Sequence, residues 1–313
     1  MKVKYKSKTV EIIFSENSSA HFANDARYFI ITDQNVDKLY PNYFNFLNDK
    51  DYFVVTPGEE SKSIEVVAKA INELLEKGYN RNDYIIAFGG GVIGDLAGFI
   101  ASIYKRGIKY INVPTTLIAQ VDSAIGGKVG INFLDFKNQI GSFYHPELVI
   151  INHNFLNSLP EIELISGKCE VLKYGALFDK ELFEDLLNND YNLKSLVKKC
   201  VEYKIDVTIE DEYDLGYRQI LNFGHTIGHA IEAKYKLPHG ISIGYGMYYE
   251  SKMPIIKDAL KKIGLSFSNV FTNLDEYILK DKKLKNNKIM MIKLKEIGKA
   301  YLEEGDISEY FSK

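Results

Sequence analysis

The fold is decided by residues 84–99, YIIAFGGGVIGDLAGF, in which an apolar run meets three consecutive glycines and a second apolar run follows. Residues 84–88 read as a buried strand, and residues 92–105 read as a helix that begins just after the glycines. The segment is long and apolar enough to imitate a membrane span, but the glycines and Asp95 favour a strand, a tight turn and a helix. This order opens a βαβ unit, and its next strand is expected at 110–114.

The alternation extends to the N-terminal side of this segment. Apolar strands are expected at 28–32 and 52–56, and a helix with apolar residues at helical spacing runs from Ile64 towards Gly78, which ends it. Strands that alternate with helices predict a parallel sheet covered by helices.

Strand-like alternation disappears from the sequence after about residue 158. Helices are expected at 159–178, 181–189, 193–212, 218–235 and 241–264. We therefore predict an α/β domain over residues 1–158 and an all-α domain over residues 159–313, with a ligand-binding cleft between them.

The composition narrows the classes of function. The chain has 313 residues, of which 39 are basic and 42 acidic, so its net charge of −3 leaves no positive excess for a nucleic-acid backbone or an anionic membrane. The N-terminus lacks the apolar region of a secretory signal, and two cysteines, Cys169 and Cys200, are too few for a disulfide framework. We therefore expect a cytoplasmic protein that acts on a small molecule.

Gly89, Gly91 and Gly94 form a G-x-G-x-x-G pattern between the expected strand and helix. Such glycines let the backbone approach a pyrophosphate, and the helix N-terminus offers free N–H groups and the positive end of its dipole. The acidic residue that usually holds a ribose about 20 positions later is missing. Asp33, at the end of the first expected strand, is an alternative for that role, and a tight turn without a ligand also fits the pattern.

A metal site is predicted from three of the six histidines, His225, His229 and His239. His225 and His229 are spaced i, i+4 and therefore share one face of a helix, while His239 lies at the start of the next helix. A carboxylate or thiolate would complete a zinc site with one open position, and the candidates are Glu170, Cys169, Glu232 and Asp122. Histidines with unrelated hydrogen bonds are the structural alternative.

Several lysines lie among small or apolar residues, which is unusual for a solvated charge. Lys128 and Lys173 are the clearest cases, and Lys137 and Lys204 are weaker ones. Because a buried ammonium group needs an anionic partner, converging lysines and an arginine predict a phosphorylated or carboxylated substrate. In a chain so rich in lysine, solvation at the surface is the ordinary interpretation for most of them.

Long blocks of this sequence occur in the same order in one known family. They are 89–99 GGGVIGDLAGF, 113–132 VPTTLIAQVDSAIGGKVGIN, 137–146 KNQIGSFYHP, 170–175 EVLKYG and 221–232 LNFGHTIGHAIE. On these blocks the chain resembles the 3-dehydroquinate synthases, a family of sugar-phosphate cyclases. The resemblance implies a Rossmann-like N-terminal domain that binds NAD, a helical C-terminal domain that binds a divalent metal (Zn²⁺ or Co²⁺) and the substrate, and a homodimer.

The resemblance also implies roles for individual residues. Glu170, His225 and His239 would be the metal ligands, and His229 would face the substrate. Substrate contacts would come from Asp122, Lys128, Asn138, Lys173, Lys204, Arg218, Asn222, His229 and one of the pair Lys282 and Lys283, with Arg106 reaching the substrate phosphate across a dimer interface. NAD contacts would come from Asp33, Asn35, Gly58, Glu59, Lys62, Gly91, Val92, Ile93, Gly94, Asp95, Thr115, Thr116, Asp122, Lys128, Lys137, Phe155 and Ser158.

Members of this family convert 3-deoxy-D-arabino-heptulosonate 7-phosphate to 3-dehydroquinate and phosphate in the shikimate pathway, and NAD is not consumed. Several positions depart from the family pattern, among them Phe136 and Cys169, which replace the usual Gly and Ala. Ala124 and Val129 each lack a hydroxyl, Asp214 is one methylene shorter than the usual Glu, and Ile241 replaces a frequent acid. None of them removes an implied metal ligand or charged substrate contact.

Three other functions are compatible with the motifs. A related cyclase acting on sedoheptulose 7-phosphate or glucose 6-phosphate would share the NAD and metal motifs. A metal-dependent polyol dehydrogenase would share the fold, but a neutral polyol needs no cluster of lysines. A binding protein without catalytic activity would have no use for a complete set of metal ligands.

Overall fold

The computed structural model describes the chain except for residues 24, 135, 268–270, 282–287 and 312–313. The chain forms two compact units, Met1–Leu159 and Pro160–Lys313. The sequence prediction placed the domain boundary one residue earlier, after residue 158. Each unit is described by itself below.

The first unit is built on a seven-stranded sheet of order β1-β2-β9-β6-β5-β3-β4. All neighbouring strands pair in parallel except β1 and β2, which are antiparallel. The strands are β1 (Lys2–Lys4), β2 (Thr9–Phe14), β3 (Arg27–Asp33), β4 (Asp49–Val55), β5 (Tyr84–Gly89), β6 (Lys109–Pro114) and β9 (Leu148–Ile151). The predicted parallel sheet is therefore confirmed.

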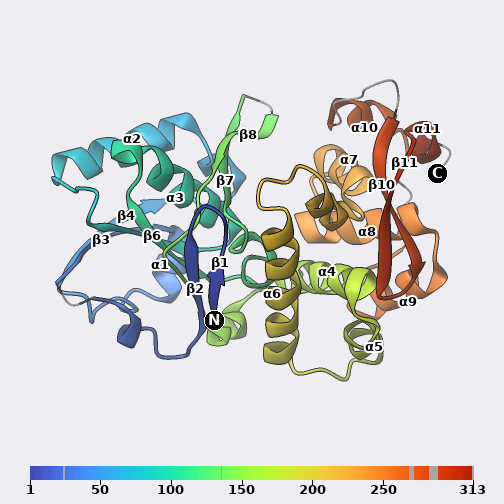
Figure 1. Cartoon of the computed structure of the whole chain (residues 1–313), viewed down its shortest axis with the longest axis horizontal. Coiled ribbons are helices and arrows are strands. Elements are labelled where there is room, and N and C mark those ends of the chain that lie inside the picture. The colour runs from blue at the N-terminus through green and yellow to red at the C-terminus, as the bar shows by residue number, and fades with distance from the viewer. Residues whose placement is uncertain (24, 135, 268–270, 282–287, 312–313) are drawn as a thin grey trace. The chain divides into compact units, whose positions relative to one another are not determined.

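Both faces of this sheet are covered, which explains why its central strands are continuously apolar. On β3, Phe29 and Ile31 pack into one core cluster with α2 (Ile64–Glu76) and α3 (Gly91–Ile103), which Figure 1 shows together beside the sheet. The alternate side chains, Tyr28 and Ile30, pack into a second cluster on the other face with Val36 of α1 (Gln34–Leu39). Period-two alternation thus supplies an apolar residue to each face.

The order of strands creates a switch point beside β3. The chain runs from β3 out to the edge strand β4 and then returns to form β5 on the opposite side of β3. Asp33 at the end of β3 and Gly89 at the end of β5 therefore lie at the same edge of neighbouring strands. Open α/β sheets bind their ligands at such a point.

A separate antiparallel hairpin, β7 (Lys128–Phe133) and β8 (Phe136–Phe143), completes the first unit. The sequence prediction missed β1, β2, β7, β8 and β9. The hairpin is hard to see in the sequence because most of β8 is exposed and its side chains do not alternate between polar and apolar.

The second unit is mainly helical, as predicted. Its helices are α4 (Glu161–Phe178), α5 (Lys180–Asn188), α6 (Leu193–Glu210), α7 (His225–Tyr235), α8 (His239–Ser251), α9 (Pro254–Lys262), α10 (Asp275–Asp281) and α11 (Ser308–Phe311). It also contains an antiparallel hairpin, β10 (Lys288–Glu296) and β11 (Lys299–Asp306), drawn in red in Figure 1. The prediction of an exclusively helical unit is wrong in this respect, although Ile289, Met291 and Ile292 of β10 are buried.

Two predicted helices are each divided in two. The expected helix 218–235 is broken at Gly224, whose φ of 81° interrupts the chain between a short 3-10 turn and α7. The expected helix 241–264 ends at Ser251, because Lys252 adopts φ 56° and Pro254 begins α9. Among the helices that the structure describes, none is long and apolar enough to cross a membrane.

Helices α7 and α8 approach one another through Gly246. A Cβ atom at this position would overlap the carbonyl oxygen of Gly224 and lie 2.7 Å from the backbone nitrogen of Gly228. These are backbone atoms and cannot turn aside as a side chain would. The close contact therefore fixes the separation of the two helices that carry the predicted metal site.

We expect Gly246→Ala to lower the free energy of unfolding by about 1–3 kcal/mol, because overpacking here outweighs the gain in helix propensity. Urea denaturation followed by circular dichroism measures it. Ser195→Ala on the exposed face of α6 is the control, since it changes propensity without a packing conflict. Equal or greater stability of Gly246→Ala would contradict the close packing.

Candidate metal centre and nucleotide-binding turn

Three histidines from two helices converge in the second unit. His225 and His229 lie on α7 and His239 is the first residue of α8. One ring nitrogen from each can be chosen so that all three lie within 4.8 Å of one another. The i, i+4 spacing aligns the first two on one helix face, and the turn between α7 and α8 returns the third to that face. The predicted histidine cluster is therefore present in the structure.

Helix α4 brings a carboxylate to the same place. Glu170 is 1% exposed, and its Oε1 lies 3.7 Å from Nε2 of His239. Within the described part of the chain, neither oxygen of this carboxylate accepts a hydrogen bond of good geometry, although Nζ of Lys173 lies 2.5 Å from Oε2. A buried carboxylate with so few donors is costly unless a further positive charge balances it.

These residues fit a divalent metal. Ligand atoms that are each about 2.0–2.2 Å from a tetrahedral metal lie roughly 3.4 Å apart, close to the separation of Glu170 and His239. Imidazole nitrogens and a carboxylate are ligands that zinc and cobalt accept. The distances bring His229 as close as His225, so geometry by itself does not distinguish the ligand set Glu170, His225 and His239 from one that includes His229.

Hydrogen bonds orient two of the histidine rings. Nδ1 of His239 lies 2.8 Å from Oε2 of Glu232, and Nδ1 of His225 lies 3.2 Å from the carbonyl oxygen of Phe223. A neutral ring that donates from Nδ1 keeps the lone pair of Nε2 available for a metal. Glu232, a candidate ligand in the sequence, is thus a partner of His239.

The two rings have opposite pKa shifts. Desolvation by the surrounding protein, together with Lys173 and the neighbouring histidines, lowers the pKa of His225. Desolvation would also lower the pKa of His239, but the hydrogen bond to Glu232 and the charge of Glu170 together raise it. Two carboxylates around one imidazole attract a cation, whether a proton or a metal.

The other two candidate ligands are a buried thiol and a carboxylate of the first unit. Cys169 is fully buried beside Gly244, and burial raises the pKa of its thiol. A high pKa disfavours the thiolate that binds metals. Asp122 belongs to the first unit, where it lies in a short π-helical turn, Ala119–Ser123.

A carboxylate that the sequence analysis missed fixes the start of α7. Glu250 of α8 accepts hydrogen bonds from the backbone N–H groups of Gly224, at 2.8 Å, and Ile227, at 3.1 Å. It therefore caps the helix whose first residue is His225. No local pattern reveals this cap, because Glu250 and the helix start are far apart in the sequence.

Basic residues expected at the substrate are buried in the second unit. Lys173, Lys204 and Arg218 are 1%, 6% and 3% exposed. Nη1 of Arg218 donates to the carbonyl oxygen of Glu212, and the carboxylate of Asp211 accepts from the backbone N–H of Arg218. Asn222 lies in the same 3-10 turn, Tyr217–Asn222. Lys204, a weak candidate for a substrate contact in the sequence analysis, is thus buried like the stronger candidate Lys173.

In the first unit the glycine turn joins β5 to α3 as predicted. Gly90 is the N-cap of α3 and provides no side-chain hydrogen bond. The backbone of Thr115 donates to the carbonyl oxygen of Gly89, and Thr116 packs against Gly90, which brings both predicted NAD contacts to the turn. Asp33 lies at the neighbouring strand end, where Oδ1 caps α1 through the backbone N–H groups of Asn35 and Val36.

Lys62 and Asp95 of the predicted NAD site form an ion pair in which the lysine is buried. Lys62 is 3% exposed, and its Nζ lies 2.8 Å from Oδ2 of Asp95 and 3.3 Å from Oε1 of Glu59. Burial raises the pKa of Asp95 while Lys62 opposes that shift. Desolvation would lower the pKa of Lys62, but Asp95 and Glu59 raise it, so the ammonium group stays charged.

Other predicted contacts of the first unit are more scattered. Lys128, Lys137, Asn138 and Arg106 are exposed, so the small neighbours of Lys128 in the sequence did not indicate burial. Ile93 and Phe155 are core residues, Val92 is partly buried, Gly58 begins the turn that carries Glu59, and Ser158 contacts Tyr40 at 2.5 Å. Lys282 and Lys283 lie outside the described residues.

Most departures from the family pattern are buried positions. Ala124, Val129 and Ile241 are 5%, 7% and 8% exposed, and Val129 packs closely against Gly98 of α3. The methyl group that replaces the usual hydroxyl at Val129 therefore lies in the apolar core. Asp214 has φ 57°, in the left-handed region.

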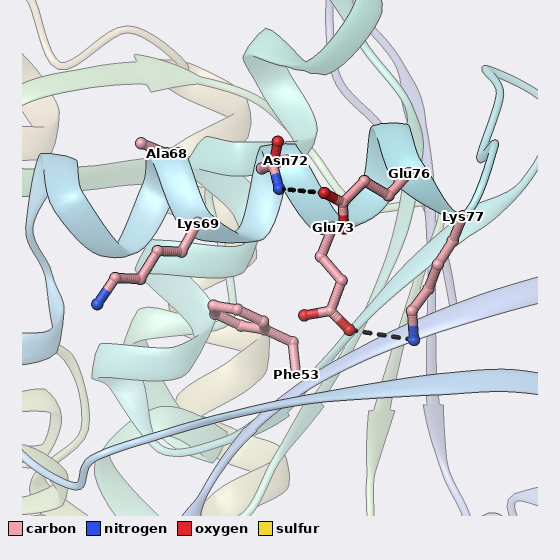
Figure 2. Close-up of a pocket in the computed structure, with 7 residues that line it drawn as sticks. All are labelled: Phe53, Ala68, Lys69, Asn72, Glu73, Glu76 and Lys77. Atoms are coloured by element: carbon pink, nitrogen blue, oxygen red, sulfur yellow. Dashed lines mark hydrogen bonds and ion pairs between the residues drawn. The ribbon is translucent and has the colours of Figure 1, made fainter.

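A surface depression between α2 and β4 contains none of the predicted site residues (Figure 2). Four of its polar side chains interact in pairs. Lys77 lies 3.1 Å from Glu73, and Asn72 donates to Glu76 at 2.9 Å, as the dashed lines in Figure 2 show. We assign no function to this depression.

Solved structures share this fold. One is a 2-deoxy-scyllo-inosose synthase complexed with carbaglucose-6-phosphate, NAD⁺ and Co²⁺. It is 27% identical to this chain with a TM-score of 0.87, and the match covers 98% of this chain and 97% of that structure. The 2-epi-5-epi-valiolone synthase of Streptomyces hygroscopicus subsp. jinggangensis 5008, with NAD⁺ and Zn²⁺ bound, is 23% identical with a TM-score of 0.89, covering 99% and 96%. The fold is that of the sugar-phosphate cyclases.

Sequence comparison then identifies the family. The family model described as 3-dehydroquinate synthase N-terminal matches residues 52–166, and the one described as 3-dehydroquinate synthase C-terminal matches residues 167–284. The 3-dehydroquinate synthase of Alkaliphilus metalliredigens is 42% identical to this chain, and the match covers 87% of this chain and 85% of the relative. The 3-dehydroquinate synthase of Clostridium perfringens is 46% identical, and the match covers 79% of this chain and 78% of the relative. The chain belongs to the 3-dehydroquinate synthase family.

We expect Glu232→Gln to weaken Zn²⁺ binding by about tenfold, because it removes the anionic partner of His239. Competition with a chromophoric chelator measures the affinity without reference to activity. Glu161→Gln, at an exposed position on α4, is the charge-matched control. Equal affinity of both variants and the unmodified protein would show that Glu232 does not support the site.

Proposed function

We propose that this chain converts 3-deoxy-D-arabino-heptulosonate 7-phosphate to 3-dehydroquinate and phosphate, as part of the shikimate pathway. Elimination of phosphate breaks a carbon–oxygen bond, so the enzyme is a lyase. The proposal rests on the buried carboxylate of Glu170, which lies beside three histidines and has few hydrogen-bond donors around it. Relatives that are 42–46% identical and named 3-dehydroquinate synthase support this substrate.

Two cofactors are part of the proposal. Glu170, His225 and His239 would hold Zn²⁺ or Co²⁺, and the turn between β5 and α3 would hold NAD, as the cofactors bound in the related cyclase support. When bound, NAD would accept a hydride from the substrate and return it, and the metal would make the hydroxyl on that carbon more acidic before its oxidation. NAD is therefore regenerated in each turnover.

The protein's own residues bind and orient an anionic substrate. Lys173, Lys204 and Arg218 are cations fixed by burial, and they suit the carboxylate and phosphate of a heptulosonate phosphate. Fixed charges stabilise the departing phosphate without the reorganisation that water would need. His229 and Asn222 would face the substrate from the same unit, and Asp122, Lys128 and Asn138 would contact it from the first unit.

The proposal extends to the oligomeric state of the protein and to its location in the cell. We propose a cytoplasmic homodimer in which Arg106 of one subunit reaches the substrate phosphate of the other. Arg106 is exposed and adopts φ 64° beside Gly107, so its side chain stands on a tight turn at the surface of its own unit. Exposure of an arginine on a strained turn is compatible with a role at a second molecule's site.

The proposed reaction predicts release of phosphate that requires NAD, stops when a chelator removes the metal, and leaves no net NADH. A phosphate assay and absorbance at the NADH band, run on the purified protein, measure these together. No release from folded, metal-loaded protein would refute the substrate. Release from sedoheptulose 7-phosphate or glucose 6-phosphate instead would identify another sugar-phosphate cyclase.

We expect Lys204→Gln to lower kcat/KM for the heptulosonate phosphate by about tenfold to a hundredfold, because a charge-assisted contact is lost. Steady-state kinetics measure the effect, and circular dichroism checks the fold. Lys198→Gln on an exposed face of the same helix is the matched control. Equal kinetics for both variants would exclude Lys204 from the substrate site.

A further inference from the structure

The β7–β8 hairpin contains a bulge opposite Asn132. Ile131 pairs with Ile140, but two residues later Phe133 pairs with Phe136, so residues 137–139 of β8 face the single residue Asn132. Asn138 lies in this bulge with φ 54°, in the left-handed region. Bulges of this kind redirect a side chain and remove a backbone N–H from the ladder.

The side chain of Asn132 receives that displaced N–H group. Oδ1 of Asn132 accepts a hydrogen bond of 2.9 Å from the backbone nitrogen of Asn138. The bulge is thereby held from the opposite strand, and the left-handed backbone of Asn138 gains a fixed partner.

The donor groups of Asn132 point the other way, to the 58–62 turn, which carries the predicted NAD contacts Gly58, Glu59 and Lys62. Its Nδ2 lies 3.3 Å from the carbonyl oxygen and 3.1 Å from Oε1 of Glu59, and its backbone nitrogen donates to the carbonyl oxygen of Lys62 at 2.8 Å. One asparagine therefore bonds to the hairpin and to the 58–62 turn at once.

Lys62 closes the ring of contacts. Its Nζ lies 2.5 Å from Oδ1 of Asn138, 2.8 Å from Oδ2 of Asp95 and 3.3 Å from Oε1 of Glu59. Three acceptors match the three donors of an ammonium group that is 3% exposed, so its position is fixed. A shift of Asn138 would therefore displace Lys62, and the converse also holds.

We propose that Asn132 is a positioning residue that couples the NAD-binding turn, through Glu59 and Lys62, to the substrate-facing Asn138. The proposal rests on the proposed function, which places Lys62 at NAD and Asn138 at the substrate. Asn132 contacts neither ligand in this scheme. It sets the geometry of residues that do, so that a single side chain acts on both binding events.

The first test is Asn132→Ala. We expect kcat for the heptulosonate phosphate to fall by about tenfold and the Kd of NAD, measured by calorimetry, to rise several-fold, because both halves of the contact are lost. Gln139→Ala is the control from the same bulge, since among the described residues the Gln139 side chain bonds to the carbonyl oxygen of Lys137 and to neither Asn132 nor the 58–62 turn. Equal kcat and Kd for Asn132→Ala and the control would overturn the proposal.

Asn132→Asp separates the hydrogen bond to Asn138 from the hydrogen bond to Glu59. Its Oδ1 still accepts from Asn138, but the donor to Glu59 is lost and a carboxylate faces Glu59 instead. We expect a raised Kd for NAD with a KM for the sugar phosphate near that of the unmodified enzyme. A raised KM with unchanged NAD affinity would contradict the assignment of the two halves.

A double-mutant cycle tests whether Asn132 acts through Asn138. Glycine at position 138 adopts the left-handed backbone freely and has no side chain to position. In the Asn138→Gly background, Asn132→Ala should therefore lower kcat much less than in the unmodified chain. Additive losses would show that Asn132 acts by another route.

Hydrogen exchange distinguishes failure of this inference from failure of the proposed function. Asn132→Ala should speed exchange of the Asn138 amide and of residues 59–62, and the Gln139→Ala control should not. This readout needs neither substrate nor NAD, so it applies even if the unmodified protein releases no phosphate. Unchanged exchange at both segments would refute the coupling whatever the enzyme's activity.

Discussion

The helical unit depends on one buried negative charge, the carboxylate of Glu170. Removing a carboxylate from water costs several kcal/mol unless positive charge surrounds it, so this part of the chain must supply that charge. Lys173 supplies it from the same helix face, one turn along α4. The histidines of α7 and α8 supply nitrogen ligands, and Gly240 lets α8 approach α4 because a Cβ atom there would overlap the carbonyl oxygen of Ser166.

The α/β unit has a corresponding constraint in the buried ammonium group of Lys62. Three acceptors surround it, and they come from the 58–62 turn, from α3 and from the β7–β8 hairpin. A charge that is desolvated and fully bonded holds its neighbours in place more firmly than apolar packing does. The glycine turn after β5 therefore lies beside a preformed polar network. That network is a suitable support for a nucleotide that must accept and return a hydride without leaving.

The parts of the fold that could be predicted are those with a strong local pattern. Strands β3, β5 and β6 and helices α2 and α3 are uninterrupted apolar or amphipathic segments bounded by glycine or polar residues, so their types were correct. The hairpins had weaker patterns: β8 is mostly exposed, and the buried residues of β10 are spaced irregularly. The breaks at Gly224 and Lys252 depend on a left-handed backbone conformation. A glycine in the sequence is compatible with that conformation but does not require it, and a lysine gives no sign of it.

By itself, the sequence determined the order of the central elements β3, β4, α2, β5, α3 and β6 in the first unit, the three clustered histidines and the resemblance to 3-dehydroquinate synthases. Each of these rests on patterns of residues close together in the chain. Only the tertiary structure decided that Lys204 is buried and Lys128 exposed, that Glu232 supports His239, and that Asn132 joins a turn to a hairpin. Burial and hydrogen bonding depend on which distant segments pack together. Neighbours in the sequence carry little information about that packing.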